Sequence, residues 1–333
     1  MSTIRWGIIG CGDVTEVKSG PGLSKARDST LVAVMRRDGA LAADYARRHG
    51  VPRWHDDAEA ILRASDIDAV YVATPPATHQ DYVLRCAQAG KPVLVEKPMA
   101  LDAFECDAMI AACAAAGVPL RVAYYRRALP RFLAVRDLVT GGAVGEVRMV
   151  VSRHFQPLRT AIEAAPASPP WRTDAARSGG GYFVDVMSHT LDFLDFLFGP
   201  IGEVRALAAN VAGAYEAEDV VTVSWRFASG IHGSGAFCYA ADRDEEWNEI
   251  VGTKGRLCFS TTRAVPIELE RGGSRESIDH GDPPHVHQPL IQTFVDELNG
   301  VGACPSTGES AARTTRVIDG ILGEYRAARR ASS

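Results

Sequence analysis

The sequence lacks a long hydrophobic run. Its most apolar stretch, residues 109–120, is mostly small alanines and is followed by Arg121, whereas a membrane-spanning helix needs about 18 apolar residues or more. The first residues also lack the long apolar core and small-residue cleavage site of a signal peptide. The sequence therefore predicts no membrane span and no secretory signal, and we expect a cytoplasmic protein.

The sequence also lacks an excess of positive charge. Lys and Arg total 36 against 41 Asp and Glu, so the formal net charge is -5. A protein that binds nucleic acid needs clustered Lys and Arg to contact phosphates. The arginine pairs here, such as Arg36-Arg37 and Arg126-Arg127, are isolated, and we expect no nucleic-acid partner.

Cysteines with metal or redox spacing are missing as well. The chain has seven cysteines, with no C-x-x-C pair and none three or four residues from a histidine, which disfavours a zinc site and a redox dithiol. Cys106 and Cys113 are seven residues apart on an expected helix. They should share its buried face and pack as small hydrophobic side chains in a reducing compartment.

The chain is 333 residues long, which suits two hydrophobic cores. Its first third alternates short β-rich runs with helical stretches, the pattern of βαβ units in a parallel sheet. Strands are expected over 4–9, 30–35, 69–73, 92–95 and 120–123, and helices over 40–49, 57–64, 79–89 and 103–116. Several helices precede a glycine that can adopt the left-handed cap: Gly50, Gly90 and Gly117. We predict a doubly wound α/β domain.

A glycine-containing turn follows the first strand. It reads Gly10-Cys11-Gly12-Asp13-Val14-Thr15 and resembles G-x-G-x-x-G/A, with Thr15 at the third small position. The glycines permit close backbone approach, so a pyrophosphate can meet N–H groups at a helix start. This context favours a dinucleotide site over a plain turn. Gly20-Pro21-Gly22 should break the first helix after less than two turns.

Arginine stands at the end of the second strand, where an NAD enzyme usually carries an acidic residue for the ribose. Arg36 and Arg37 can hold a 2′-phosphate and stack on adenine, which favours NADP as the cofactor, with NAD as the alternative. Two solvated arginines at a strand end explain the same residues. Asp38 is an alternative ribose partner.

Five motifs occur in order along most of the chain. They read GIIGCG at 7–12, ATPPATH at 73–79, VEKPM at 95–99, WR at 171–172 with GGGYFVDVMSH at 179–189, and HQPLI at 287–291. Together they resemble the Gfo/Idh/MocA oxidoreductases, which include glucose-fructose oxidoreductase and inositol dehydrogenase. The resemblance implies a Rossmann domain, residues 1–125, and a substrate-binding and oligomerisation domain, residues 126–333, with nicotinamide chemistry in the cleft between them.

The second domain implied by the resemblance is an α/β domain with a large, mainly antiparallel open sheet. The sequence independently predicts strands over 146–155, 204–211, 220–227, 231–239, 246–251, 257–261 and 266–270, with hairpin signals at Ser229-Gly230 and Gly272-Gly273-Ser274. One face of this sheet is often a subunit contact in the family. The resemblance therefore implies a homodimer or homotetramer.

Lys97 follows the fourth predicted strand, at the carboxyl edge where open α/β sheets bind ligands. By resemblance it lies beside the reacting carbinol and the nicotinamide, where an ammonium group can polarise a carbonyl and assist proton transfer. Composition alone favours an ordinary exposed lysine. The resemblance also suggests that Glu96 orients Lys97 or the cofactor, and that the Lys97-Pro98 bond is cis.

Asp185 and His189 are four residues apart on an expected helix after the glycine run, so their side chains share a face. A carboxylate beside an imidazole can fix its tautomer and poise it for proton transfer near neutral pH. We therefore predict that both are catalytic and, like Lys97, contact the substrate. The alternative is a helix in which both residues make only local hydrogen bonds.

Other residues enter through the resemblance. Those that should line the cofactor are Thr74, Pro75, Pro76 and His79, although a Pro-Pro turn with Thr78 as helix N-cap explains them structurally. Trp171 and Arg172 should approach the cofactor, after a proline-rich loop at 166–170 that we interpret as a cover over a cleft. Tyr125 is a candidate substrate contact, with packing as the alternative.

A histidine-rich stretch at 280–287 suggests a metal site at first sight. Its prolines exclude a helical pair of ligands, no second cluster is nearby, and residues 287–289 match a helix start. We predict no metal. Asp192 and Asp195, which lie among Leu and Phe further along the helix of Asp185, should serve capping or helix packing.

The predicted function is an NAD(P)-dependent oxidoreductase that interconverts a secondary alcohol and a ketone on a sugar, cyclitol or related polyol. No Ser or Cys triad accompanies Lys97, Asp185 and His189, which disfavours a hydrolase. Dihydrodiol dehydrogenase or tetrapyrrole reductase activity is an alternative on the same fold. A regulatory protein that binds NADP without turnover is another alternative, although a sensor has no use for all three residues.

Overall fold

The computed structural model describes residues 1–158 and 170–332. Positions 166–169 of the proline-rich loop lie outside them. The chain divides into two compact units, the first being Met1–Leu129 with Pro283–Ala312 and the second Pro130–Asp282 with Arg313–Ser333. The domain boundary expected from the sequence differs from this division, because Pro283–Ala312 returns to the first unit.

The first unit is built on a six-stranded sheet in the order β3-β2-β1-β4-β5-β6, with every neighbouring pair parallel. The strands are β1 (Ile4–Ile9), β2 (Ser29–Met35), β3 (Arg53–His55), β4 (Ala69–Val72), β5 (Val93–Val95) and β6 (Leu120–Val122). The five predicted strands are confirmed to within one residue at each end. The strand order reverses direction between β1 and β4, which is where ligands bind in doubly wound sheets.

Two hydrophobic cores cover the two faces of this sheet. One face packs against α4 (Glu59–Leu62), α5 (His79–Gln88) and α6 (Ala103–Ala116), and it includes the buried Cys106 and Cys113 as expected. The other face packs against α2 (Gly20–Lys25), α3 (Gly39–His49) and α11 (Gln288–Leu298). The apolar face of α11, with Leu290, Ile291 and Phe294 fully buried, explains why this late segment belongs to the first unit.

The first helix is broken where the sequence predicts. α1 (Asp13–Val17) ends before the Gly20-Pro21-Gly22 segment, which begins α2. A Cβ atom on Gly20 would lie 2.2 Å from the carbonyl oxygen of Thr15 and 2.2 Å from the Tyr45 hydroxyl, so only glycine fits. The predicted left-handed glycines at helix ends are confirmed, with φ of 64° at Gly50, 68° at Gly90 and 68° at Gly117.

The second unit is built on an eight-stranded sheet in the order β14-β13-β12-β11-β7-β10-β9-β8. Its strands are β7 (Val147–Phe155), β8 (Ile201–Ala209), β9 (Val220–Phe227), β10 (His232–Cys238), β11 (Glu245–Gly252), β12 (Gly255–Phe259), β13 (Ile267–Arg271) and β14 (Ser274–Ile278). β7 and β10 pair in parallel and the other neighbours are antiparallel. The expected large, mainly antiparallel sheet and both predicted hairpins are confirmed.

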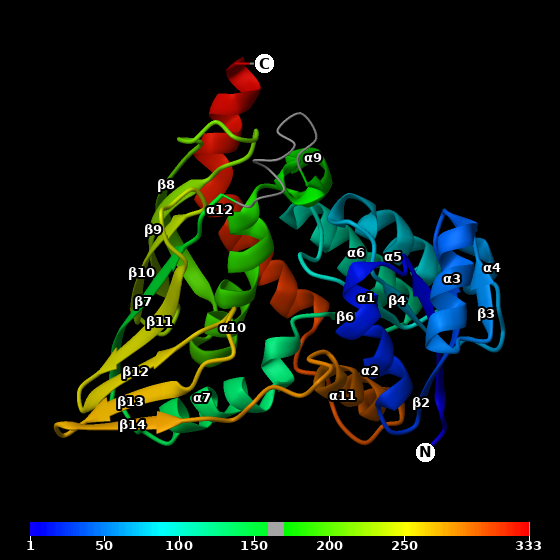
Figure 1. Ribbon diagram of the computed structural model, residues 1–333, viewed down its shortest axis with the longest axis horizontal. Coiled ribbons are helices and arrows are strands. Elements are labelled where there is room, and N and C mark those ends of the chain that lie inside the picture. The colour runs from blue at the N-terminus through cyan, green and yellow to red at the C-terminus, as the bar shows by residue number, and fades with distance from the viewer. Residues whose placement is uncertain (159–169, 333) are drawn as a thin grey trace. The chain divides into compact units, whose positions relative to one another are not determined.

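Two long helices of the second unit lie along one face of the eight-stranded sheet. α10 (Ser188–Phe198) and α12 (Gly308–Ser332) lie along this face (Figure 1), with α7 (Pro130–Thr140) and α9 (Ala175–Ser178) in the same unit. Along β9, buried Val221, Val223 and Trp225 alternate with exposed residues, the pattern of a strand covered on one side. Among the described residues, no helix is long and apolar enough to cross a membrane.

Candidate active site

The glycine turn after β1 lies at the switch point of the first sheet. Gly10 has φ of 93°, and a Cβ there would meet Thr74 Cγ2 at 2.6 Å, so the position requires glycine. The N–H groups of Gly10 and Cys11 both donate to the Met35 carbonyl, at 2.8 and 3.1 Å. The turn is thus tied to β2 and stays open for close approach by a ligand, which fits a dinucleotide phosphate at the start of α1.

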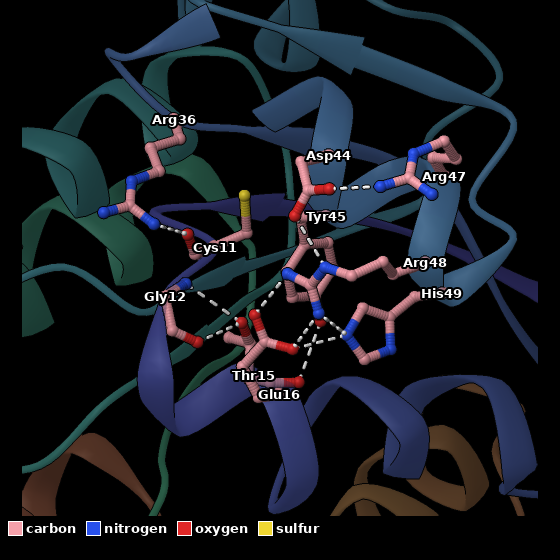
Figure 2. Close-up of polar contacts among 10 residues, drawn as sticks. All are labelled: Cys11, Gly12, Thr15, Glu16, Arg36, Asp44, Tyr45, Arg47, Arg48 and His49. Carbon is pink, nitrogen blue, oxygen red and sulfur yellow. Dashed lines mark hydrogen bonds and ion pairs between the residues drawn. The ribbon is translucent and has the colours of Figure 1, made fainter. Parts of the chain in front are cut away.

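Thr15 closes the turn in place of the third small residue of the motif. Figure 2 shows its hydroxyl accepting from the Gly12 N–H at 3.0 Å and donating to the Gly12 carbonyl at 2.7 Å. The Tyr45 hydroxyl in α3 donates to the Thr15 carbonyl at 2.8 Å. Glu16 pairs with Arg48, and hydrogen bonds from Arg48 and His49 lower the pKa of Glu16 to about 2 despite partial burial. These contacts hold α1 against α3.

Arg36 extends across this turn from the end of β2. Its Nη1 donates to the Cys11 carbonyl at 3.4 Å (Figure 2), which places a cation beside the predicted pyrophosphate site. Arg37 is exposed. Asp38 caps α3, since its carboxylate accepts from the Leu41 N–H at 3.1 Å. Of these three residues, Arg36 is the one that contacts the glycine turn.

The turn after β4 is held from beneath by a buried histidine. Thr74 and Pro75 lead into the short helix η1 (Pro76–Thr78). His79 is fully buried, and its ring nitrogens lie 2.7 Å from the Thr74 carbonyl and 3.1 Å from the Pro98 carbonyl. Thr78 is found at the predicted cap position, but its hydroxyl accepts no hydrogen bond from an N–H of α5 and donates to the Pro75 carbonyl at 3.0 Å. His79 therefore links this turn to the turn that follows Lys97.

Glu96 and Lys97 follow β5 at the same edge of the sheet. The Lys97-Pro98 bond is cis, as the sequence resemblance suggests. The Glu96 carboxylate is 7% exposed and accepts from the Lys97 N–H at 3.1 Å, from His287 Nε2 at 3.0 Å and from the Tyr71 hydroxyl. Burial raises the pKa of Glu96, but the contacts with His287, Tyr71 and Lys97 outweigh it and lower the pKa to about 2. The site therefore contains an ionised carboxylate directly before Lys97.

Tyr125 lies in the short helix η2 (Tyr125–Ala128) after β6. Its ring packs against that of His287, with centroids 4.3 Å apart, and the Arg126 guanidinium lies 4.8 Å from its centroid. The residue is half-buried. Packing on His287 accounts for its position, and a substrate contact stays a prediction.

Asp185 and His189 lie in the second unit on two successive helical segments. The single helix expected from the sequence is instead a π-helix, η4 (Phe183–Met187), followed by α10. The wider π-helical turn gives Asp185 a backbone setting that differs from that of His189. His189 is 7% exposed and Asp185 retains 19% of its side-chain surface. Both side chains are thus largely withdrawn from solvent.

Arg172 contacts Asp185. Its Nε lies 3.4 Å from Asp185 Oδ2, and its guanidinium stacks over Trp171 at 4.6 Å from the ring centroid. The short helix η3 (Trp171–Thr173) thereby presents a cation to the carboxylate. The sequence predicts Trp171 and Arg172 as cofactor contacts and does not predict the ion pair between Arg172 and Asp185.

A buried carboxyl group supports the glycine run before η4. Glu218 is 1% exposed and accepts from the Gly181 N–H at 2.8 Å. A Cβ on Gly180 would lie 3.1 Å from this carboxylate, and one on Gly181 would lie 2.5 Å from the Glu218 carbonyl. Burial raises the pKa of Glu218 to about 7. The sequence singles out the glycines but not this partner, which lies 37 residues away.

A second buried polar group lies on the strands of the same unit. Glu246 on β11 accepts from the Thr261 N–H and hydroxyl, both at 2.9 Å, and from Ser260. Burial opposes ionisation, but these donors and the nearby His154 lower the pKa of Glu246. The Tyr239 ring lies 5.3 Å from that of His154. Buried residues alternate with half-buried ones along β11 and the second half of β7, but His154 and Glu246 are polar residues at buried positions, so an apolar pattern in the sequence does not identify them.

Two of the three histidines of the 280–287 stretch contact protein groups. His285 contacts Lys25 Nζ at 2.9 Å and the Val17 carbonyl at 2.7 Å, while His287 binds Glu96. In the part of the chain that the structure describes, no group of three His, Cys, Asp or Glu side chains could hold a metal. Asp195 pairs with Arg313 at 2.7 Å, in line with the expected packing role.

The fold and these residues define a class. A doubly wound sheet with a glycine turn at its switch point, joined to a unit with a large open sheet, is that of a nicotinamide-nucleotide oxidoreductase. Residues 4–124 match the oxidoreductase family with an NAD-binding Rossmann fold, and residues 132–258 match the GFO/IDH/MocA C-terminal domain. The chain belongs to the Gfo/Idh/MocA family and is an NAD(P)-dependent oxidoreductase.

Similar proteins support this membership along the whole chain. An oxidoreductase of Formosa agariphila is 36% identical over 97% of this chain and 99% of its own length. Inositol 2-dehydrogenase of Rhizobium meliloti is 34% identical over 81% of this chain and 79% of its own. The crystal structure of aldose-aldose oxidoreductase from Caulobacter crescentus superposes with a TM-score of 0.84 at 26% identity, covering 99% and 98% of the two chains.

Proposed function

We propose that this enzyme interconverts a secondary alcohol and a ketone on a sugar, cyclitol or related polyol. The observation that carries the proposal is the placement of Lys97 directly after β5, at the sheet edge that also holds the glycine turn. Inositol 2-dehydrogenase and 1,5-anhydro-D-fructose reductase of Ensifer adhaerens, 28% identical over 92% of this chain, support the substrate class. A bound nicotinamide supplies the acceptor or donor of the hydride.

The proposal assigns the proton to residues of this chain. Lys97 hydrogen-bonds the substrate oxygen. Its neutral amine takes the hydroxyl proton when the carbinol is oxidised, and the resulting ammonium gives a proton back to the oxygen when the carbonyl is reduced. His189 is the second candidate for this proton, with Asp185 orienting it and Arg172 holding Asp185 at 3.4 Å. Lys97 belongs to the first unit, and His189, Asp185 and Arg172 belong to the second.

The proposal also names NADP as the preferred cofactor. Arg36 supports it, because its guanidinium reaches the carbonyl of Cys11 at 3.4 Å in the glycine turn and a planar cation suits a 2′-phosphate. Asp38, the alternative partner for an NAD ribose, is engaged as the N-cap of α3. Thr74, Pro75 and Pro76 complete the proposed cofactor surface.

Equilibrium binding of NADPH and NADH to the purified protein tests the cofactor. We expect NADPH to bind more tightly, and Arg36→Asp to remove about tenfold of that preference, as expected for losing a charge-assisted contact. Arg37→Asp is the matched control, since it makes the same charge change at the exposed neighbour. Tighter NADH binding would contradict the NADP preference, whereas equal losses in both variants would contradict the assignment of the 2′-phosphate to Arg36 alone.

Turnover of Lys97→Ala tests the catalytic assignment. We expect a fall of about 100-fold or more in kcat with inositols, ketoses and other polyols, in line with loss of a general acid–base group, while NADPH affinity changes little. Equal loss of cofactor binding would make Lys97 a binding residue. If the wild type binds NADPH but turns over no substrate, the alternative of a regulatory protein that binds NADP without turnover is favoured.

Oxidation of trans-dihydrodiols is a second candidate. Trans-1,2-dihydrobenzene-1,2-diol dehydrogenase of Bos taurus is 29% identical over 79% of this chain. The same proton transfer at Lys97 serves a vicinal diol on a ring. Higher kcat/KM for a dihydrodiol than for any inositol or sugar would select this function.

We further propose that the chain forms a homodimer or homotetramer through the uncovered face of the eight-stranded sheet. Support comes from apolar side chains on strands of that sheet that keep solvent exposure, with Leu207 on β8 75% exposed and Met149 on β7 37% exposed. Sedimentation velocity should show an oligomer that Met149→Glu weakens. A wild-type monomer at micromolar concentration would reject it.

The cytoplasmic location expected from the sequence is part of the proposal. No disulfide joins the seven cysteines in the described part of the chain, and five of them are buried, as suits a protein kept in a reducing compartment. Cell fractionation with an antibody to the native protein would test it, and recovery outside the cytoplasm would reject it.

A further inference from the structure

The two oxygens of the Glu96 carboxylate bind different groups. Oε2 accepts from the backbone N–H of Lys97, the next residue, at 3.1 Å. Oε1 accepts from His287 Nε2 at 3.0 Å and from the Tyr71 hydroxyl. The carboxylate thus connects residues on β4 and at the start of α11 to the backbone at Lys97.

His287 is held firmly where it meets this carboxylate. The residue precedes α11 and its backbone N–H donates to the Lys18 carbonyl at 3.4 Å. Its side chain is 3% exposed, and its ring packs on Tyr125 with centroids 4.3 Å apart. Close contact between α11 and α2 fixes the helix itself, because a Cβ on Gly22 would lie 3.0 Å from Ile291 Cδ1.

The hydrogen bonding of the ring has a defined direction. Among the described residues, His287 Nδ1 is buried and has no hydrogen-bond partner, while Nε2 faces a carboxylate that can only accept. A proton on Nε2 therefore satisfies the pair. Removing this donor would leave a buried carboxylate oxygen with the Tyr71 hydroxyl alone, and an under-satisfied buried charge drives local rearrangement.

We propose that His287 is a positioning residue for Lys97. By holding Oε1 of Glu96, it orients the carboxylate whose Oε2 holds the Lys97 backbone, and so sets where the lysine side chain starts. The proposal rests on the function proposed above for its catalytic consequence, since Lys97 is the assigned proton-transfer group. Its structural consequence, the fixed Lys97 N–H, does not depend on that function.

The test compares His287→Gln with His287→Asn. The Gln amide nitrogen lies as many bonds from Cα as Nε2 and can reach Oε1, whereas the Asn nitrogen is one bond short. We expect Asn to speed exchange of the Lys97 amide hydrogen, measured by NMR, and to lower kcat, each by about tenfold or more, because small displacements of reacting groups are costly. Gln should keep both within about threefold of the wild type, a size set by replacing one hydrogen-bond donor with another.

Three controls make the result specific. NADPH affinity and KM should change by less than about twofold in both variants, since neither removes a binding group. Amides of α6, elsewhere in the first unit, should keep their exchange rates. Tyr71→Phe, which removes the other donor to Oε1, should behave like Asn.

Several outcomes would overturn the proposal. One is an Asn variant with wild-type exchange at Lys97 and wild-type kcat. Another is equal loss in Gln and Asn together with faster exchange throughout the first unit, which would make ring packing the role of His287. If Asn fails to fold, Gln and Tyr71→Phe decide by the same readouts. If the wild type turns over no substrate, the proposed function is wrong. Exchange of the Lys97 amide hydrogen still tests whether His287 holds Glu96 in place.

Discussion

Each unit contains a buried glutamate next to residues predicted to be catalytic, and the two differ in charge. Glu96 in the first unit is 7% exposed and Glu218 in the second is 1% exposed. Burial raises the pKa of both. For Glu218 the result is a pKa of about 7, whereas Glu96 ends at about 2.

The partners explain the difference. Glu96 accepts hydrogen bonds from the His287 ring and the Tyr71 hydroxyl, and it lies near the Lys97 charge. All three favour the ionised carboxylate. Burial opposes ionisation of Glu218. Backbone N–H groups, such as that of Gly181, and the charge of Arg326 act against this effect, but they do not outweigh it. Similar burial therefore yields a permanent anion beside Lys97 and a carboxyl that titrates near neutral pH beneath the glycine run before Asp185.

Replacing the anion should have the largest effect. Glu96→Leu leaves His287 and Tyr71 without their acceptor, and breaking such a buried pair typically costs about 3 to 5 kcal/mol. We expect urea denaturation at pH 7 to show a loss of this size. Glu218→Leu at pH 5 is the matched control, where the wild-type carboxyl is neutral, and its loss should be smaller. Equal losses would remove the contrast between the two glutamates.

The pH dependence of Glu218→Gln sharpens the contrast. Because the folded-state pKa of about 7 exceeds the ordinary 4.5, the unfolded state loses its proton first as pH rises. Stability of the wild type then falls between about pH 4.5 and 7, by at most about 3 kcal/mol from this group. The glutamine cannot ionise, so the variant should gain stability relative to the wild type from pH 5 to pH 8.

Urea denaturation of both proteins across this pH range measures the difference. Glu96→Gln serves as the comparison, because an anion with a pKa of about 2 stays ionised over the whole interval. A difference between wild type and Glu218→Gln that does not change from pH 5 to pH 8 would show that Glu218 is already ionised in the folded protein.

Another buried carboxylate of the second unit pairs with an arginine that is partly exposed. Asp195 keeps 4% of its side-chain surface and pairs with Arg313, which is 38% exposed. We expect Arg313→Ala to cost about 2 kcal/mol, less than loss of a fully buried partner because water reaches part of the arginine. Chemical denaturation measures it, with Arg330→Ala, an exposed arginine of the same helix, as control. A cost no greater than the control's would remove Asp195 from the comparison.

The sequence predicts the elements with strong local signals. The strand Ile4–Ile9 and the helix Ala103–Ala116 are found with the expected ends, because each combines a clear period with a turn or cap signal. The missed strands are Arg53–His55 and Ser274–Ile278, which lie at sheet edges. Edge strands bury little, so neither has a run of apolar residues.

The candidate site divides in the same way. Gly10, Glu96 and Lys97 stand in local motifs that sequence can recognise. His287 is 191 residues from Glu96, and its motif indicates only a helix start. The change from the π-helix η4 to the α-helix α10 is likewise not visible in the sequence, because the spacing of Asp185 and His189 suits an ordinary α-helix. Contacts between segments that are far apart in the sequence can be found only from the folded structure.

The smallest expected effect concerns an exposed carboxylate. Asp38 caps α3 through the Leu41 N–H at 3.1 Å, and Asp102 caps α6 through the Glu105 N–H at 2.9 Å. Asp38→Ala and Asp102→Ala should each cost about 1 kcal/mol in urea denaturation, the usual value of an N-cap. Unlike the buried glutamates, neither should alter kcat. If Asp38 instead holds the cofactor ribose, its variant alone will weaken NADH binding, and titration of both variants with NADH and NADPH separates the cap from the ligand.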